Sequence, residues 1–357
     1  MHSISLEKNS AAFLSPCSKS KLLFAGFALV IVISTFLPFG LGAELPAVCK
    51  KEIPAITFKN LSPPYKDYLY FQHHQFFPFE YKASVFRLIN AWWLAEASTL
   101  VYADEAFVKQ RFSEAGLKRV KFFNRSGTQC FIAANKRFAI VAFRGSEIWK
   151  RNERFDPGQI IADFKTNIDI RLSDWIRGGR VHSGFKAALD DVWEEMLPEI
   201  KILEARGIKI WVTGHSLGAA LATLAADRLL DVQGLYTFGS PRVGDQEFQS
   251  RFQLKAFRVV NGNDIVTSMP AKNPYHHVGE LKFIDPKGGI KDQPGFVEES
   301  DGIPCIDASN ASESGKESQK FDSSVFIPSL IRNHVPLLYS ILLWNELVGK
   351  TEIKWLR

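Results

Sequence analysis

A serine stands in the motif Gly214-His215-Ser216-Leu217-Gly218, after an apolar run at residues 208–213 and before an alanine-rich run at residues 219–230. This order predicts a strand, a sharp turn and a helix. Such a turn exposes the serine hydroxyl, and its glycines allow backbone and helix to approach closely. A serine hydroxyl becomes a good nucleophile when a histidine takes its proton and a carboxylate stabilises that histidine. Ser216 is therefore expected to have a histidine and a carboxylate as partners.

The carboxylate is expected downstream of Ser216, because sheets with such a turn supply the acid and then the histidine from the ends of later strands. Asp264 fits this position, since residues 257–260 are predicted to form a strand and residues 261–264 form the loop that leaves it. Its alternative role is that of a hydrogen-bonding residue in an Asx-type turn. Asp245 is the weaker candidate, because nearby Arg242 offers it an ordinary ion pair.

Two histidine sites lie downstream of Asp264, namely His276-His277 and His334. His334 stands just before Pro336 at the beginning of the last helical stretch, which would hold it beside the sheet. His276-His277 instead precede a predicted strand, where a histidine more often closes a loop by hydrogen bonding. The residues favour His334 and leave the pair as the alternative.

The oxyanion of a tetrahedral intermediate needs two aimed hydrogen-bond donors. The backbone N–H of Leu217, the residue after the nucleophile, is one candidate. Ser146 is the other, because it ends the predicted strand that begins at residue 138, and Gly145 before it allows close approach. Its N–H and its hydroxyl could both donate. A helix-capping role for Ser146 is the alternative and is compatible with the first.

These residues must be positioned by alternating strands and helices. The apolar patterns predict strands at 120–123, 128–133, 138–143, 209–212, 234–238, 256–260 and 278–284, and helices at 84–102, 181–196, 219–230 and 325–347. This alternation predicts an α/β fold with a mainly parallel central sheet and helices on both faces. Residues 44–357 are interpreted as one domain, in which 44–83 form a wrapped N-terminal extension and 285–324 a long exposed loop.

Composition narrows the classes of function. The chain has 357 residues, 46% of them hydrophobic, which is enough for a large core. Its net charge of +6 is mild and no Lys/Arg stripe is interleaved with aromatics, so no nucleic-acid partner is expected. No Cys or carboxylate stands at ligand spacing from His73-His74, so packing or surface roles are favoured for that pair and no metal or cofactor is expected.

The first 43 residues predict export. Lys19 and Lys21 precede the uncharged residues 22–43, which end in Gly-Leu-Gly-Ala, as in a secretory signal. The alternative is an uncleaved membrane anchor formed by residues 22–43, and both place the remainder outside the cytoplasm, either secreted or periplasmic. In such an oxidising compartment we expect a disulfide between Cys49 and Cys305, which occupy polar segments near the two ends. Cys130, within a predicted strand, is expected to be a buried thiol.

Five segments together resemble the class 3 lipases, the family that includes filamentous-fungal triacylglycerol lipases, within the α/β-hydrolase superfamily. They are Ala95-Glu96-Ala97-Ser98 with Tyr102, Phe143-Arg144-Gly145-Ser146, Val181-His182-Ser183-Gly184-Phe185, residues 213–219, and Phe238-Gly239-Ser240-Pro241-Arg242-Val243-Gly244. The resemblance implies the α/β-hydrolase fold, with no metal required. It also implies Ser216 as nucleophile, Asp264 as acid, His334 as base, and Ser146 with Leu217 as oxyanion donors.

The resemblance also implies a lid after Ser146, a segment that is lengthened here by residues 147–158. Apolar side chains punctuate the charged stretch 147–167 and suit a lid with one apolar face that opens on lipid. They are Trp149, Phe155, Ile160, Ile161 and Phe164. The alternative is a surface loop with a few anchoring aromatics.

The function that follows is an exported serine ester hydrolase that acts on lipid esters at a lipid–water interface, as triacylglycerol lipases do. Membrane contact would come through the lid or an uncleaved N-terminal segment. A phospholipase A1 or another lipid esterase is the first alternative. A non-catalytic lipid-binding member of the fold is the second.

Overall fold

The computed structural model describes residues 48–57, 60–61, 63–145, 171–293 and 327–355. The chain divides into two compact units, Met1–Cys49 and Lys50–Arg357. The second unit contains every helix and strand described below. No helix in the described part of the chain is long and apolar enough to cross a membrane, and residues 22–43 lie outside that part.

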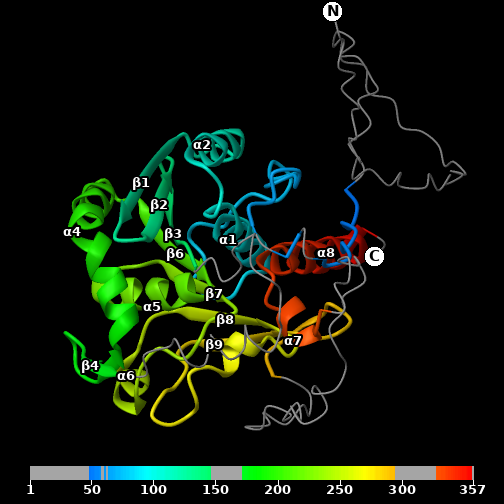
Figure 1. Ribbon diagram of the computed structural model, residues 1–357. Coiled ribbons are helices and arrows are strands. Elements are labelled where there is room, and N and C mark those ends of the chain that lie inside the picture. The colour runs from blue at the N-terminus through cyan, green and yellow to red at the C-terminus, as the bar shows by residue number, and fades with distance from the viewer. Residues whose placement is uncertain (1–47, 58–59, 62, 146–170, 294–326, 356–357) are drawn as a thin grey trace, which may run out of the picture. The chain divides into compact units, whose positions relative to one another are not determined.

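The second unit is built on an eight-stranded sheet (Figure 1). Five neighbouring strands are parallel, and antiparallel strands flank them on both sides. In spatial order the strands are β1 (Arg119–Arg125), β2 (Thr128–Ala134), β3 (Phe138–Phe143), β6 (Lys209–His215), β7 (Gly234–Phe238), β8 (Ala256–Asn261), β9 (Glu280–Ile284) and β10 (Ile290–Lys291). The predicted mainly parallel α/β sheet is confirmed.

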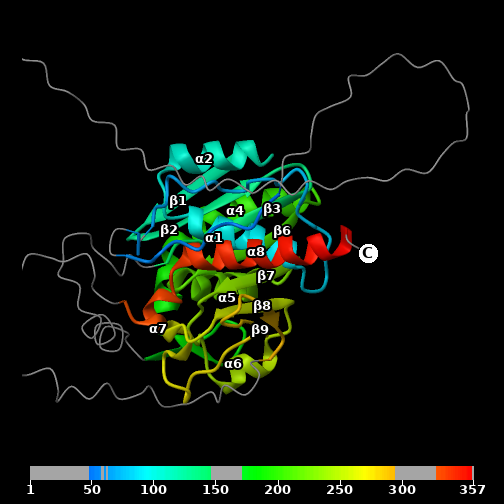
Figure 2. The same ribbon diagram turned by 90° about the vertical axis from the view of Figure 1, so that its right-hand side faces the viewer.

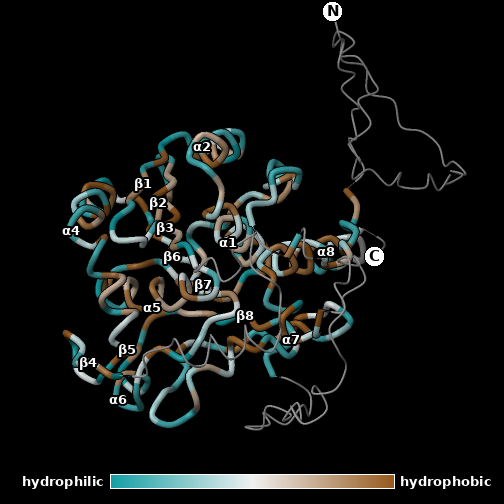
Figure 3. The backbone as a smooth tube through the Cα atoms, in the orientation of Figure 1, coloured by the Kyte–Doolittle hydropathy of each residue, from teal (hydrophilic) through white to brown (hydrophobic). Residues whose placement is uncertain are grey.

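One face of this sheet packs against α4 (Ser183–Ala205) and α5 (Leu217–Leu229). Ile210 and Val212 of β6 join the same buried cluster as Leu221 and Leu224 of α5. Figure 3 shows the reason in the sequence, because α5 is hydrophobic over most of its length whereas α4 alternates between hydrophilic and hydrophobic residues. The more uniformly apolar helix is the one that the sheet and α4 cover.

The other face packs against α1 (Leu88–Leu100), and α8 (Pro336–Trp355) lies over α1 (Figure 2). Trp211 and Thr213 alternate with Ile210 and Val212 along β6 and therefore face this side. The Thr213 hydroxyl donates to the Leu94 carbonyl of α1 at 3.3 Å. Helices thus cover both faces of the sheet, as the sequence predicts.

Smaller elements complete the unit. They are α2 (Glu105–Glu114), β4 (Leu172–Asp174), β5 (Arg180–His182), α6 (Gln246–Arg251), the 3-10 helix η1 (Ile265–Ser268) and α7 (Ser329–Arg332). The sequence reasoning missed α2, although Asp104 caps it by accepting a hydrogen bond from the Phe107 N–H at 3.0 Å. An acidic residue before a helical stretch is a usable start signal.

Four predicted boundaries were wrong. The helix predicted from residue 84 begins at Leu88, and residues 180–182 form β5 ahead of α4. The single helix predicted over 325–347 is divided into α7 and α8 by a turn at Asn333–Val335. Ile290 and Lys291, placed in a long loop, pair with β9 as β10, while residues 294–324 of that loop lie outside the described part.

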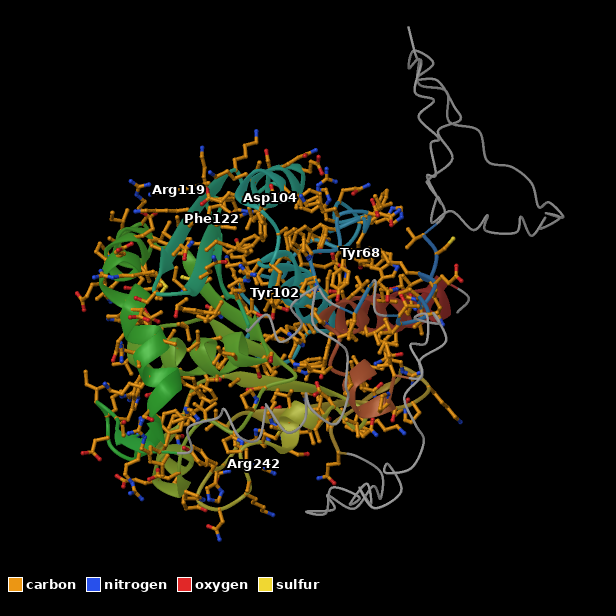
Figure 4. All side chains as sticks on the ribbon, in the orientation of Figure 1. Tyr68, Tyr102, Asp104, Arg119, Phe122 and Arg242 are labelled. Atoms are coloured by element: carbon orange, nitrogen blue, oxygen red, sulfur yellow. The ribbon has the colours of Figure 1, made fainter. Side chains whose placement is uncertain are left out.

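The N-terminal extension is held against α1 and α8 by a buried polar network. Lys51 Nζ donates to the Tyr68 hydroxyl at 2.7 Å, and that hydroxyl donates to Glu96 of α1 at 2.6 Å. Glu96 also accepts from the Trp92 indole N–H and the Phe71 backbone N–H. Burial raises the pKa of Glu96, and Lys51 opposes the shift. Turns dominate this part of the extension, and Figure 4 labels Tyr68 there.

Replacing Glu96 by alanine should lower the free energy of unfolding by about 3–5 kcal/mol, because one partner of a buried charged pair is lost and its donors stay buried. Urea titration measures the change. The control is Glu105→Ala on α2, whose ion pair with Lys109 is exposed, and which should cost less than about 1 kcal/mol. A Glu96→Ala effect as small as the control's would contradict the importance of this network.

The sequence also led to predictions for a histidine pair and for cysteines that lie outside the site. His73 stacks on Trp344 with ring centroids 5.9 Å apart, which is a packing role. Cys130 is buried on β2 with its Sγ 3.9 Å from the Met196 sulfur, as predicted. Cys305 lies beyond the described residues, so the Cys49–Cys305 disulfide stays a prediction.

Candidate active site

Ser216 occupies a strained turn between β6 and α5. Its backbone has φ 59° and ψ −130°, a region that side chains rarely adopt outside special turns. The turn is tight enough that a Cβ on Gly214 would collide with the Gly218 backbone, and one on Gly218 with the Phe143 carbonyl. This is the strand–turn–helix geometry that presents a serine hydroxyl at the end of a parallel strand.

The structure brings three of the predicted residues together. Ser216 Oγ lies 3.0 Å from His334 Nε2, and His334 Nδ1 lies 2.9 Å from Asp264 Oδ2. All three residues are buried. With the Nδ1 proton donated to Asp264, Nε2 is free to accept the serine proton, so the arrangement can activate Ser216 for acyl transfer.

Asp264 follows the end of β8 and caps η1. Its Oδ1 accepts a hydrogen bond from the Val266 N–H at 2.9 Å, and its Oδ2 accepts from His334 and from the Tyr339 hydroxyl, the latter at 2.6 Å. The Asx-type turn considered for Asp264 is therefore present as well, and one carboxylate serves both roles. Each oxygen has a donor that fixes the plane of the carboxylate beside the imidazole.

The weaker candidates lie elsewhere. Asp245 caps α6 by accepting from the Phe248 N–H at 2.9 Å, and its ion pair is with Arg180, not with the expected Arg242. Arg242 instead donates to the Ser268 and Pro270 carbonyls (Figure 4). His277 closes a loop through a 2.8 Å contact with the Thr267 carbonyl, and His276 bridges to Gly244.

The predicted oxyanion donors are described only in part. Leu217 opens α5, where the first N–H groups of a helix have no acceptor within it. Ser146 falls outside the described residues, although Gly145 before it is buried at the end of the β3 segment. The predicted lid residues Trp149, Phe155, Ile160, Ile161 and Phe164 are likewise outside them.

Sequence reasoning missed two residues that touch the Ser–His–Asp arrangement. Tyr339 lies on the first turns of α8 and donates to Asp264, while its own oxygen accepts from the Asn261 N–H at 3.1 Å. Gly239, with φ +54°, allows close approach, because a Cβ there would lie 2.6 Å from Asp264 Oδ2 and 2.9 Å from His334 Nδ1. No local signal in the sequence marks Tyr339. Gly239 belongs to the segment 238–244, one of the five that carry the family resemblance.

Tyr339→Phe should lower kcat about tenfold with little change in KM, because it removes a buried charge-assisted hydrogen bond to Asp264 without touching the serine. Burial and Asp264 raise the pKa of Tyr339, so its proton stays in place to donate. Steady-state kinetics on a soluble ester measure the effect. The matched control is Tyr236→Phe, since that buried hydroxyl contacts the Arg87 N–H instead. Equal kcat values in the two variants would refute a role for Tyr339.

No group of three His, Cys, Asp or Glu residues suited to a metal ion occurs in the parts of the chain that the structure describes. An anchored serine, imidazole and carboxylate suit acyl transfer.

Part of this chain is similar in sequence to a known protein family and to several known proteins. Residues 140–273 match the family described as lipase (class 3). A phospholipase A1-II 6 from Oryza sativa subsp. japonica is 32% identical over 186 residues, covering 43% of this chain and 45% of that protein. A secreted mono- and diacylglycerol lipase 1 from Fusarium solani is 36% identical over 157 residues, covering 39% and 45%.

The chain spans less than half the length of these curated relatives. Among solved structures, a lipase from Rhizopus microsporus var. chinensis matches with 25% identity and a TM-score of 0.44, covering 56% of this chain and 74% of that one. The matched family segment begins within β3, includes β6, β7 and β8 with Ser216 and Asp264, and ends before His334.

Proposed function

We propose that this chain is an exported serine hydrolase that cleaves the carboxylic esters of lipids, with acylglycerols as the preferred class, on the basis that residues 140–273 match the class 3 lipase family. The observation that carries the proposal is the continuous hydrogen-bonded arrangement of Ser216, His334 and Asp264. The matched family and the relatives named lipase support a lipid ester as the substrate.

The proposed reaction has two halves. His334 Nε2 takes the proton of Ser216 as the hydroxyl oxygen attacks the ester carbonyl, and it then gives that proton to the departing alcohol. Leu217 and Ser146 would donate hydrogen bonds to the oxyanion. The acyl group remains on Ser216 until a water, deprotonated by His334, releases the fatty acid.

Asp264 has two tasks in this scheme. It holds His334 in the tautomer that leaves Nε2 free to accept a proton, and it stabilises the imidazolium that forms twice in each cycle. Its hydrogen bonds from Val266 and Tyr339 keep the carboxylate aligned with the imidazole. No metal or cofactor has a step in the proposal.

A phospholipase A1 is the alternative within the same chemistry, and it is favoured by the similarity to a rice protein of that name. The two activities share every residue proposed for catalysis and differ in the headgroup accepted. A non-catalytic lipid-binding protein is the alternative of another class.

The test is hydrolysis by the protein, made through a secretory pathway, of a panel of short-chain esters, triacylglycerols, phospholipids and galactolipids. Preference for triacylglycerols supports the proposal, and preference for the sn-1 ester of phospholipids favours the alternative. Failure to label Ser216 with a fluorophosphonate probe would contradict both enzymatic readings and leave the binding protein.

Export is part of the proposal and has its own support. The signal-like residues 1–43 and the secreted Fusarium relative both point to it. Recovery of the protein in the culture medium, and the sequence of its mature N-terminus, would distinguish cleavage from retention by residues 22–43.

A further inference from the structure

His215 precedes the proposed nucleophile, and both nitrogens of its buried ring are engaged. Its Nε2 lies 2.8 Å from the backbone carbonyl oxygen of His334, and its Nδ1 lies 3.3 Å from the Tyr102 hydroxyl. Because a carbonyl oxygen can only accept, Nε2 must carry the proton. In the neutral ring, which the lowered pKa of His215 favours, Nδ1 then accepts from the Tyr102 hydroxyl.

The Tyr102 hydroxyl also lies against Gly145, two residues beyond the end of β3. A Cβ on Gly145 would overlap that hydroxyl, so the approach depends on glycine. Two hydrogen-bonding contacts thus link Tyr102 through His215 to the backbone carbonyl of His334 (Tyr102 is labelled in Figure 4).

The His215 ring also packs against the imidazole that it helps to place. The His215 and His334 centroids are 4.4 Å apart, and the Tyr339 ring lies 5.9 Å from that of His215. Burial, and then the nearby His334, lower the pKa of His215 well below its ordinary value. The titratable groups that face it are Tyr102, His334 and Tyr339, with Asp264 behind the last two. A neutral neighbour lets His334 become charged without repulsion between two imidazoliums.

A second contact holds the neighbouring carbonyl of the same loop. Asn261, at the end of β8, donates from Nδ2 to the Asn333 carbonyl at 3.0 Å. Consecutive carbonyls of the turn between α7 and α8 are therefore held by side chains at the ends of β6 and β8. His334 is fixed through its backbone as well as through its ring.

We propose that His215 is a positioning residue for the proposed ester hydrolysis, holding the backbone of His334 so that its Nε2 stays within reach of Ser216. The proposal rests on the hydrolase function given above. Its contribution is placement of the base, because a displacement of about 1 Å in a reacting group can cost up to about 100-fold in rate.

Three substitutions of His215 distinguish the effect of its Nε2 hydrogen-bond donor from the effect of its ring. His215→Gln retains an amide N–H near the position of Nε2, His215→Asn has an amide too short to reach the His334 carbonyl, and His215→Phe retains a ring without a donor. Asn and Phe should lower kcat by about 10- to 100-fold with KM within about twofold. Gln should restore most of the loss. The rate at which fluorophosphonate labels Ser216 should follow the same order.

The control is His277→Phe, which removes the contact of another, half-buried histidine to a backbone carbonyl, that of Thr267. It should lower the melting temperature and leave kcat within about threefold. Melting temperatures are measured for every variant, and if either the Asn or the Phe variant fails to fold, the comparison of Gln with the remaining one decides.

Wild-type kcat in the Asn and Phe variants, or losses as large in Gln as in the other two, would overturn the positioning role. A wild-type protein that the probe does not label overturns this inference together with the proposed function. Labelling without hydrolysis of any lipid ester overturns only the proposed function, and the labelling rates of the variants then decide the role of His215.

Discussion

Replacing Ser216 by alanine should reduce ester hydrolysis by about 10⁴-fold or more and abolish labelling by fluorophosphonates. The substitution removes the Ser216 hydroxyl oxygen, which lies 3.0 Å from His334 Nε2, and leaves the imidazole–carboxylate pair in place. Rate losses of about this size follow removal of the nucleophile from serine hydrolases, because the residual activity comes from the remaining binding and oxyanion contacts. Initial rates on the preferred ester of the panel measure the effect.

The fold should survive this change. The change to alanine removes one oxygen atom, and the close backbone approaches at Gly214 and Gly218 that shape the turn remain. Ser98→Ala is the control, because its buried hydroxyl donates to the Ala95 carbonyl within α1 and takes no part in the site. Parent-like hydrolysis by Ser216→Ala, with the control equally active, would refute the acyl-enzyme mechanism.

His334→Ala should lower kcat by a similar factor, about 10⁴-fold or more, because no other group then takes the serine proton. Its ring is the common partner of Ser216 and Asp264, so the substitution disconnects the carboxylate from the nucleophile. Reaction with a small, activated ester, followed under single-turnover conditions, would separate slow acylation from slow release of the acyl group.

The matched control for this substitution is His276→Ala. The sequence left His276-His277 as the alternative base, and the structure places His276 at a backbone bridge with Gly244. Activity should remain near the parent level in His276→Ala. If His276→Ala lost activity and His334→Ala retained it, the assignment of the base would have to be reversed.

The lengthened segment after Ser146 bears on substrate range rather than on the chemistry. Trp149, Phe155, Ile160, Ile161 and Phe164 remain predictions for a lid with one apolar face. The choice between acylglycerols and phospholipids depends on which headgroup reaches Ser216. The substrate panel addresses that choice directly, because both readings share Ser216, His334 and Asp264.

Local patterns in the sequence were sufficient for the sheet and the nucleophile turn. The runs 138–143 and 209–212 are short, apolar and β-branched or aromatic, and they form β3 and β6 within two or three residues of the predicted bounds. Boundaries failed where tertiary contacts intervene. The turn that separates α7 from α8 is one such place, because side chains of β6 and β8 hold its carbonyls.

Chain order reduced the candidate partners of Ser216 to a few carboxylates and histidines, but it could not select among them. Asp245 and Asp264 both follow predicted strands, and only folding shows that one caps α6 and pairs with Arg180 while the other faces His334. Tyr339 escaped notice because its position has no local pattern, and His215 was noted only as a member of the turn motif. Their roles depend on residues that are far away along the chain.

Local patterns therefore predict an α/β chain with a serine in a sharp strand–turn–helix, because hydrophobic period and turn chemistry act over a few neighbouring residues. Which groups complete the site depends on tertiary packing. His334 meets Asp264 across 70 residues and Ser216 across 118, and His215 meets the His334 carbonyl across 119. Contacts at such separations are fixed by how helices and strands pack, and no spacing along the chain encodes them.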